Sequence, residues 1–317
     1  MFRLATSLLS PGGARGRLSA FIFHRVLAAP DPLLPSEPHA ELFDRMLGWI
    51  GSQFNVLPPL EACERLYANS LPARAAIITF DDGYRDNHDV ALPLLQKHRM
   101  GAAFFVATGY LNGGTMFNDR VIEAVRGARA AAVDVGWLGL GRLPLTDDAQ
   151  RRAAIDRLLK VVKYLSPPER LVQVQRIEEA CQAGTAKELM MSDAQVLACH
   201  RAGIELGGHT RNHPILRALP DTQAHQEIIS GRDDLRALTG QAPALFAYPN
   251  GKLGGDFDDR HRAMVEAAGF RFGLTTEPGT TGTGDDRFLM RRHTPWARKA
   301  WRFAWQAADN LRRGVKR

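Results

Sequence analysis

Short apolar segments alternate with segments of helical character along most of the chain, and this alternation constrains the fold more than any other feature. Amphipathic stretches at 40–51, 60–68 and 87–98 predict helices. Strands and helices in alternation indicate an α/β protein with a parallel sheet, open or closed into a barrel, with functional side chains at the carboxyl ends of the strands. The apolar segments have the length and the flanking residues of buried strands, and they cover residues 18–24, 75–80, 102–108, 204–210, 244–251, 271–276 and 287–294.

The alternation is interrupted between the strands at 102–108 and 204–210. Residues from about 112 to 192 have the frequent charges and the spacing of helices. We interpret them as a helical insertion over the sheet, within a single domain of residues 1–317. A basic helix is predicted near the end of the chain, at about 296–313.

The net charge of +7 is spread along the chain, with much of the excess in the last twenty or so residues. A solvated basic surface is the simpler interpretation, and attraction to an anionic membrane or an acidic glycan is the alternative. The predicted tail helix mixes Trp301, Phe303 and Trp305 with arginines, so it either packs against the sheet or lies on a membrane surface.

Cysteine usage and hydropathy limit the cellular compartments in which we expect this protein. Cys63, Cys181 and Cys199 are far apart and form no CxxC pair, which argues against a disulfide framework or a cysteine metal site. No segment approaches the roughly 18 uninterrupted apolar residues of a membrane span. Residues 1–20 lack the apolar core of a secretory signal. We therefore expect a cytoplasmic protein, with peripheral membrane contact as an open alternative.

Two adjacent carboxylates end the strand predicted at 75–80. Asp81, Asp82 and Gly83 follow the apolar run directly. Like charges this close repel, so one of the two carboxyls should have an abnormal pKa unless a cation lies nearby. Taken alone, an Asp-Asp-Gly sequence is most often an ordinary turn.

Two histidines follow another predicted strand and offer ligands for such a cation. His209 and His213 are four residues apart, and Pro214 disfavours a helix through His213. Two imidazoles and one carboxylate suit Zn²⁺ or a similar ion and leave a position open for water. Two unrelated surface histidines are the simpler interpretation of the pair alone. Their placement at a strand end, as for Asp81 and Asp82, favours a shared site.

Three segments together resemble a known family. "TFDDGYRDN" (79–87), "HTRNHP" (209–214) and "FAYPNG" (246–251) resemble the first three motifs of the polysaccharide deacetylases, also called the NodB-homology or carbohydrate esterase family 4 proteins. "MFNDRVIEAVR" (116–126) is similar to a bacterial subgroup associated with exopolysaccharide gene clusters. The resemblance, which covers about 21–294, implies a distorted (β/α)7-type barrel and metal-dependent removal of N-acetyl groups from a glycan.

The resemblance also implies roles for the charged residues. Asp82, His209 and His213 would bind the metal, and Asp81 would be the base that accepts a proton from the metal-activated water. The charge of the metal would keep Asp81 ionised despite burial. The backbone N–H of Asn250 would stabilise the oxyanion.

The general acid and the substrate groove are less defined. His24, which ends the first strand, and His293 compete for the acid, and we favour His24. The family's third motif begins with an arginine that supports the base, but this chain has Ala247 there; Arg291 or Arg292 is expected to replace it. The family's tryptophan-bearing fourth motif is absent.

The remaining site predictions concern the substrate. Tyr248 and Pro249 would shape the loop that carries Asn250, and a purely structural turn is the alternative. Asn118 and Asp119 are expected to line the substrate groove.

The leading hypothesis is therefore a Zn²⁺-dependent N-deacetylase of an acetylated polysaccharide or lipid-linked oligosaccharide, with a role in exopolysaccharide biosynthesis. Deacylation of a small amide or sugar ester is a second hypothesis, because activated water attacks either kind of carbonyl. An inactive glycan-binding homologue is the third, although such a protein would not need a base beside its ligands. Nothing in the sequence favours nucleic acid as a partner.

Overall fold

The computed structural model describes residues 9–182, 184 and 188–313. The expectation of no secretory signal rests in part on residues 1–8, which lie outside the described residues. The described chain divides into two compact units. The first contains residues up to 29, 36–111 and 191 onward, and the second contains 30–35 and 112–190.

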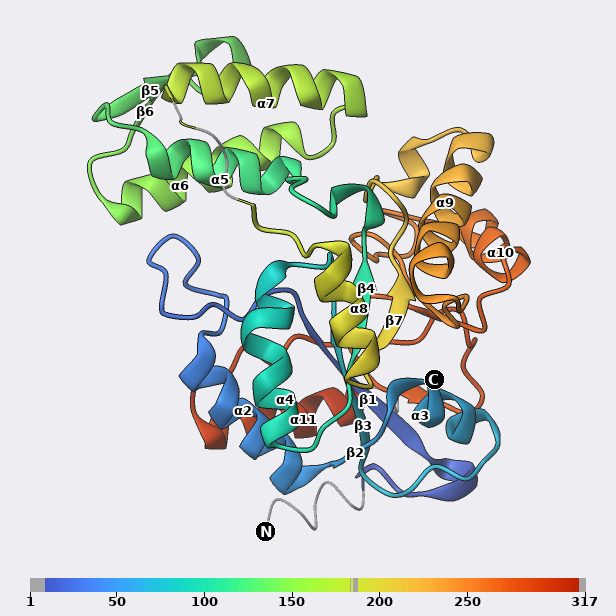
Figure 1. Ribbon diagram of the computed structural model, residues 1–317. Coiled ribbons are helices and arrows are strands. Elements are labelled where there is room, and N and C mark those ends of the chain that lie inside the picture. The colour runs from blue at the N-terminus through green and yellow to red at the C-terminus, as the bar shows by residue number, and fades with distance from the viewer. Residues whose placement is uncertain (1–8, 183, 185–187, 314–317) are drawn as a thin grey trace. The chain divides into compact units, whose positions relative to one another are not determined.

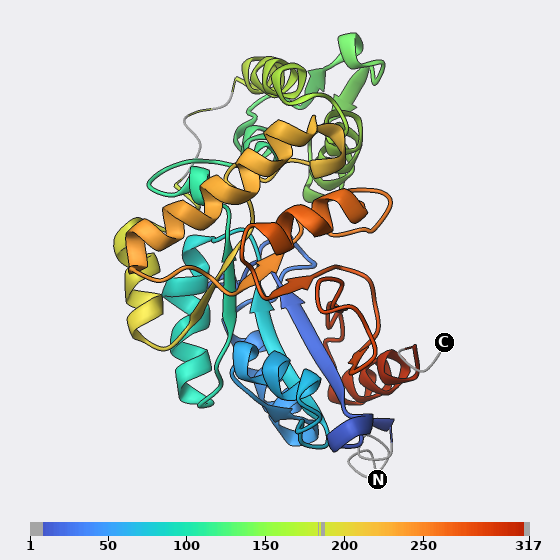
Figure 2. The same cartoon turned by 90° about the vertical axis from the view of Figure 1, so that its right-hand side faces the viewer.

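A parallel sheet forms the centre of the first unit, as the alternation predicts. Figure 2 shows its central strands side by side. β10 (Thr281–Gly282) pairs antiparallel with β1, and β2 (Asn55–Val56) pairs with the start of β3. The parallel strands, in spatial order, are β1 (Arg17–Phe23), β3 (Ala75–Phe80), β4 (Ala103–Val106), β7 (Glu205–Gly208), β8 (Leu245–Ala247) and β9 (Phe272–Leu274).

Residues 290–293 connect the two ends of this sheet. Met290 bridges to Leu274 in β9, and His293 bridges to Phe21 in β1, both in parallel. The His293 N–H donates to the carbonyl of Ala20 at 2.9 Å. These bridges close the sheet and confirm the distorted barrel that the family resemblance implies.

The strand predicted at 287–294 is wrong in detail, because this segment pairs at single residues and not along a ladder. The Arg291 N–H donates to the Thr281 hydroxyl, and the Arg292 N–H donates to the carbonyl of Glu277. Neither N–H therefore joins a backbone ladder with β1 or β9.

Alternate strand residues face the barrel interior or the surrounding helices, as the two-residue period of a strand requires. One set, which includes Leu18, Ile77 and Phe105, packs inside the barrel. The other set, which includes Phe21 and Phe80, packs against the helices. This alternation fixes which polar residues at the strand ends face inward.

Helices of the first unit surround the strands, and α4 and α8 lie along one face of them (Figure 1). The helix predicted at 87–98 begins instead as a π-helical turn at Asn87–Ala91, before α4. The helices are α2 (Ala40–Gln53), α3 (Pro59–Tyr67), α4 (Leu92–Lys97), α8 (Asp193–Arg201), α9 (Asp221–Thr239), α10 (Asp259–Ala267) and α11 (Ala300–Arg313).

The predicted tail helix begins later than expected. It starts at Ala300 because residues 294–298 follow the barrel segment in an irregular path that includes Pro295. Among the described residues, no helix is long and apolar enough to cross a membrane.

The second unit is mainly helical and has its own apolar core. Its range is close to that of the predicted insertion, and residues 30–35, which no sequence pattern indicated, also belong to it. Val121, Val125, Leu158, Val174 and Ile177 are buried together. Its elements are α5 (Phe117–Gly127), α6 (Asp148–Val162), α7 (Pro167–Cys181) and the antiparallel pair β5 (Ala132–Asp134) and β6 (Arg142–Pro144).

Candidate metal centre

The turn after β3 sends its two carboxylates in different directions. Asp82 has a φ of 76°, in the left-handed region that residues with a side chain rarely adopt, and Gly83 follows at φ 90°. The Gly83 N–H donates to the carbonyl of Asp81 and closes the turn. Strained backbone of this kind is typical of functional sites, where surrounding contacts hold it.

Asp82 meets both histidines of the HxxxH segment. One carboxylate oxygen, Oδ1, lies 3.4 Å from Nε2 of His209 and 3.4 Å from Nε2 of His213. One ligand atom from each residue lies within 4.8 Å of the others. His209 follows β7 directly, and His213 reaches the same point through a turn in which it has a φ of 50°.

The three residues fit a divalent metal ion. Asp82 Oδ1 is buried and has no hydrogen-bond partner among the described residues, so this oxygen is available as a ligand atom. Nδ1 of His209 lies 2.7 Å from the carbonyl oxygen of Ala247. That acceptor places the ring proton on Nδ1 and leaves the Nε2 lone pair directed at Asp82, as in metal-binding histidines.

Burial and the neighbouring charges shift the pKa values of all three side chains. Burial lowers the pKa of His213 to about 4, with Asp82 opposing the shift, so its imidazole is neutral and can bind a metal near pH 7. Burial alone would raise the pKa of Asp82, but His213 and His209 hold it below its ordinary value. Burial also opposes a charged His209, yet Asp81 and Asp82 raise its pKa.

Asp81 points into the barrel and pairs with Arg292. Both carboxylate oxygens of Asp81 accept hydrogen bonds from the guanidinium, at 2.6 and 2.8 Å. Arg292 is fully buried, and its Nε donates to the carbonyl of Thr275 at 2.9 Å. A fourth hydrogen bond, of 3.2 Å, runs from the guanidinium to the hydroxyl of Thr79. The arginine is therefore held rigidly behind the carboxylate.

This pair corrects our account of why Asp81 stays ionised. Burial would raise the pKa of Asp81, but the charge and hydrogen bonds of Arg292, together with the charges of His209 and His24, lower it below its ordinary value. Arg292 therefore supplies a positive charge at Asp81 that is separate from any charge of the metal. Of the two arginines considered for this position, Arg292 contacts Asp81, whereas Arg291 donates its backbone N–H to the Thr281 hydroxyl.

The two candidate acids occupy different environments. His24 follows β1 at the same edge as Asp81, since the Asp81 N–H donates to the carbonyl of Phe23. It is close enough to interact electrostatically with Asp81, Asp82 and His213.

His293 lies on the helix-facing side, so the structure does not bring it into the metal cluster. Its ring centre is 4.7 Å from that of Phe21, and Nδ1 is 2.9 Å from the amide nitrogen of Asn310. Burial lowers the pKa of His293 to about 4.

The loop after β8 presents a free backbone donor. Asn250 has a φ of 60°, and its carbonyl accepts from the hydroxyl of Thr276 at 2.7 Å. Among the described residues, its N–H has no acceptor. The Tyr248 side chain is fully buried and stacks on Phe257 at 3.8 Å, and Pro249 is also buried. These two buried residues therefore anchor the loop that carries Asn250 to the protein interior.

Asn118 and Asp119 lie in the first turn of α5, in the second unit. Their expected place in the substrate groove stays a prediction.

Two features of the site have no signature in the sequence. The Ala247 carbonyl orients His209, and any residue type would offer that carbonyl. Glu37 is half-buried beside His24 and Arg25: burial raises its pKa, while those two residues oppose the shift. The loop that carries Glu37 gave no signal of a role near His24.

A small pocket adjoins His24. It has a volume of about 100 Å³, and its lining includes Glu37, Met46, Trp296 and Arg298. Its residues come from the loop after β1, from α2 and from the segment after Arg292, which all meet at the carboxyl-terminal edge of the barrel.

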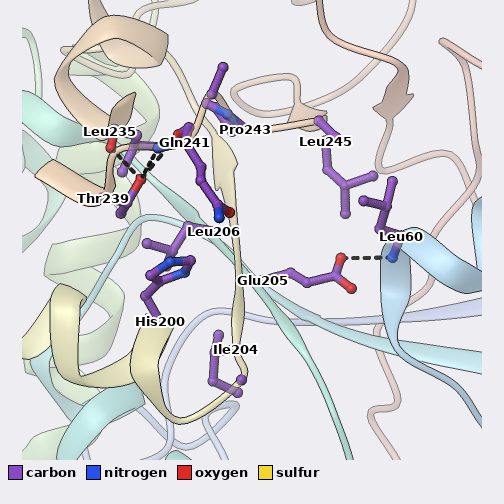
Figure 3. Close-up of a pocket in the computed structure, with 13 residues that line it drawn as sticks. Leu60, His200, Ile204, Glu205, Leu206, Leu235, Thr239, Gln241, Pro243 and Leu245 are labelled. Carbon is purple, nitrogen blue, oxygen red and sulfur yellow. Dashed lines mark hydrogen bonds between the residues drawn. The ribbon is translucent and has the colours of Figure 1, made fainter. Parts of the chain in front are cut away.

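A second pocket, of about 250 Å³, lies at the opposite ends of the strands (Figure 3). It contains Glu205, whose carboxylate accepts the Leu60 N–H at 2.7 Å. Pro58 and Pro59 have no N–H, so Leu60 supplies the first free donor of α3 and Glu205 satisfies it. The length of β7 separates this pocket from His209.

Comparison with known proteins agrees with the fold. Residues 68–273 match the family model described as polysaccharide deacetylase. Over 278 residues the chain is 19% identical to the "Putative polysaccharide deacetylase YxkH" of Bacillus subtilis (strain 168), covering 87% of this chain and 70% of that protein.

Solved structures of similar fold include IcaB from Ammonifex degensii, with a TM-score of 0.61 and 18% identity over 94% of this chain and 98% of the other. The Streptococcus pyogenes deacetylase PplD in complex with acetate has a TM-score of 0.56 and 18% identity, covering 96% of this chain and all of the other.

Proposed function

Because the chain belongs to the polysaccharide deacetylase family, we propose that it is a metal-dependent hydrolase that removes N-acetyl groups from a polysaccharide or a lipid-linked oligosaccharide. Exopolysaccharide modification is the process that the subgroup resemblance suggests. The observation that carries the proposal is the convergence of Asp82, His209 and His213 on one point, with the Asp81–Arg292 pair beside it.

Asp82, His209 and His213 would hold the metal, and we expect Zn²⁺ from the mixture of imidazole and carboxylate ligands. When bound, such an ion polarises a carbonyl and lowers the pKa of a water molecule from about 15.7 toward neutrality. The protein residues then divide the remaining work.

Asp81 accepts the proton of the attacking water, because Arg292 keeps it ionised and fixed in orientation. The Asn250 N–H donates to the acyl oxygen as it gains negative charge. His24 donates a proton to the leaving amine, since His293 is turned toward the helices.

An inactive glycan-binding protein is the less favoured alternative. Such a protein would have no need to bury the Asp81–Arg292 pair, because burying two charges is costly unless they serve a purpose or are well compensated. Deacylation of a sugar ester or small amide uses the same residues, so only substrate comparison separates it from the proposal.

The test is acetate release from a panel of N-acetylated oligosaccharides, O-acetylated oligosaccharides and small acetamides. The proposal expects the N-acetylated oligosaccharides to have the highest kcat/KM, with activity lost in Asp82→Ala. Preference for the esters or the small amides would favour the alternative substrate class. Absence of acetate release from all three would leave the binding function.

A further inference from the structure

Three tryptophans stand exposed at the carboxyl-terminal end of the first unit. Trp296, Trp301 and Trp305 are 61%, 60% and 65% exposed, which is unusual for the largest apolar side chain. Trp301 and Trp305 are one helical turn apart on α11, so they project from the same face of the helix. Trp296 precedes this helix by a few residues.

The opposite face of α11 is already buried against the barrel. Phe303, Ala307 and Leu311 are buried in the core formed with the helix-facing side of the strands, and Phe303 lies 5.8 Å from Phe21 between ring centres. Packing against the barrel therefore accounts for one face of the helix. It does not account for Trp301 and Trp305.

Basic residues surround the exposed rings. Arg298, Arg302 and Arg312 are exposed, and the guanidinium of Arg302 lies 5.1 Å from the ring centre of Trp301. Asp309, an acid on the same helix, is paired with Arg313 at 2.8 Å. We define the Trp face as Trp296, Arg298, Trp301, Arg302, Trp305 and Arg312.

We propose that the Trp face docks on an anionic lipid bilayer. Tryptophan rings favour the headgroup region of a membrane, and each nearby arginine adds attraction to anionic lipid. The rings of the Trp face stand singly among charges, without neighbouring exposed leucine or isoleucine on α11. That pattern suits shallow insertion at a charged interface better than the continuous apolar core of a protein–protein interface.

Docking by this face would bring the candidate active site to the membrane. Trp296 and Arg298 also line the 100 Å³ pocket that contains His24. A glycan held at the bilayer surface would therefore reach His24 past the same residues that contact lipid. This step rests on the proposed function, and within it the geometry favours a lipid-linked oligosaccharide as the substrate class.

Vesicle co-sedimentation tests the docking with the full chain. We expect binding to vesicles of phosphatidylcholine mixed with phosphatidylglycerol, weakened by salt, and little binding to phosphatidylcholine alone. Arg302→Gln and Arg312→Gln should each weaken binding by roughly five-fold. The tryptophan fluorescence of the wild type should shift to the blue when vesicles are added. Trp301→Ser/Trp305→Ser should abolish both the binding and this shift. Tyr164→Ser, at a 70% exposed aromatic in the second unit, is the matched control and should bind normally.

Equal binding to neutral and anionic vesicles, or undiminished binding by the tryptophan variant, would overturn the proposal. The proposal would also be overturned if the wild-type protein does not bind vesicles and instead self-associates through Trp301 and Trp305. Hydrolysis of a soluble acetylated oligosaccharide separates this proposal from the proposed function: the tryptophan variant should retain it. If the wild type releases no acetate but still binds anionic vesicles, the function fails while the docking stands.

Discussion

Arg292 grips Asp81 with two hydrogen bonds, of 2.6 and 2.8 Å, although the two residues are 211 positions apart in the chain. A bidentate pair of this kind fixes the orientation of the carboxylate as well as its charge. The general base of the proposed reaction is therefore held by the segment that closes the barrel, and this arrangement leads to the first two predictions.

Asp81→Asn should reduce kcat by about 10²- to 10⁴-fold, the usual contribution of a general base, while metal binding persists. Metal content and acetate release measured on the same preparation check this. The substitution also leaves a buried arginine without its partner, which costs about 3–5 kcal/mol of stability. Asp81→Asn/Arg292→Met removes both charges and is the folded control. Full activity in either variant would remove Asp81 from the mechanism.

Arg292→Met should move the acidic limb of the pH–rate profile to higher pH. Burial would then be opposed only by the charges of His209 and His24, so the pKa of Asp81 should rise and a higher pH is needed to ionise the base. Activity should fall most below neutral pH and recover on the alkaline side. Arg291→Met is the matched control, because Arg291 is the adjacent residue in the chain and its side chain is not bonded to Asp81. The pH–rate profile of this variant should be that of the wild type. An unshifted limb in Arg292→Met would contradict the role of the pair.

The sequence predicts the elements of this site better than their connections. Apolar strands followed by Asp81, Asp82 and His209 place all three at one edge of a parallel sheet, and the structure shows them there. Strand alternation also explains why Arg292 faces the barrel and His293 faces the helices, because consecutive residues of an extended segment point to opposite sides. That argument requires residues 290–293 to be recognised as extended from the sequence. Because they pair with the sheet only through single bridges, their sequence carries only a weak strand pattern.

Other features depend on tertiary contacts that residue types do not encode. The left-handed φ of Asp82 belongs to the turn that follows β3 and continues through Gly83 beside the neighbouring strand. The Ala247 carbonyl orients His209 only because β7 and β8 are neighbours. The start of α11 at Ala300, later than predicted, follows from how the chain leaves the barrel.

His24→Ala should lose the alkaline limb of the pH–rate profile and about 10²- to 10⁴-fold in kcat, with metal content unchanged. His293→Ala should keep both limbs, because this histidine is packed against Phe21 and Asn310. Its expected effect is a loss of about 1–3 kcal/mol in the free energy of unfolding. The reverse result, with the alkaline limb lost in His293→Ala alone, would exchange the two assignments.

Glu205→Gln should flatten the pH dependence of stability. Burial raises the pKa of Glu205 from 4.5 to about 7, so the folded protein holds this proton more tightly than the unfolded chain. The free energy of unfolding should therefore fall as pH rises between these values. Glutamine still accepts the Leu60 N–H, and above pH 7 the variant should be more stable by on the order of 1–2 kcal/mol, allowing for partial solvent exposure.

Urea unfolding at several pH values measures this effect. Glu41→Gln, at an exposed acid whose charge does not act on Glu205, is the control and should keep the wild-type slope. If Glu205→Gln also keeps that slope, the carboxyl does not titrate with the raised pKa.

The central claim is that one metal ion at Asp82, His209 and His213 drives deacetylation. The direct test is acetate release from an N-acetylated oligosaccharide by metal-stripped protein, followed as Zn²⁺ is added in steps. The account predicts no activity without metal, a linear rise, and saturation at one equivalent, with no recovery in His213→Ala. Full activity in the stripped protein, or recovery in His213→Ala equal to that of the wild type, would contradict it.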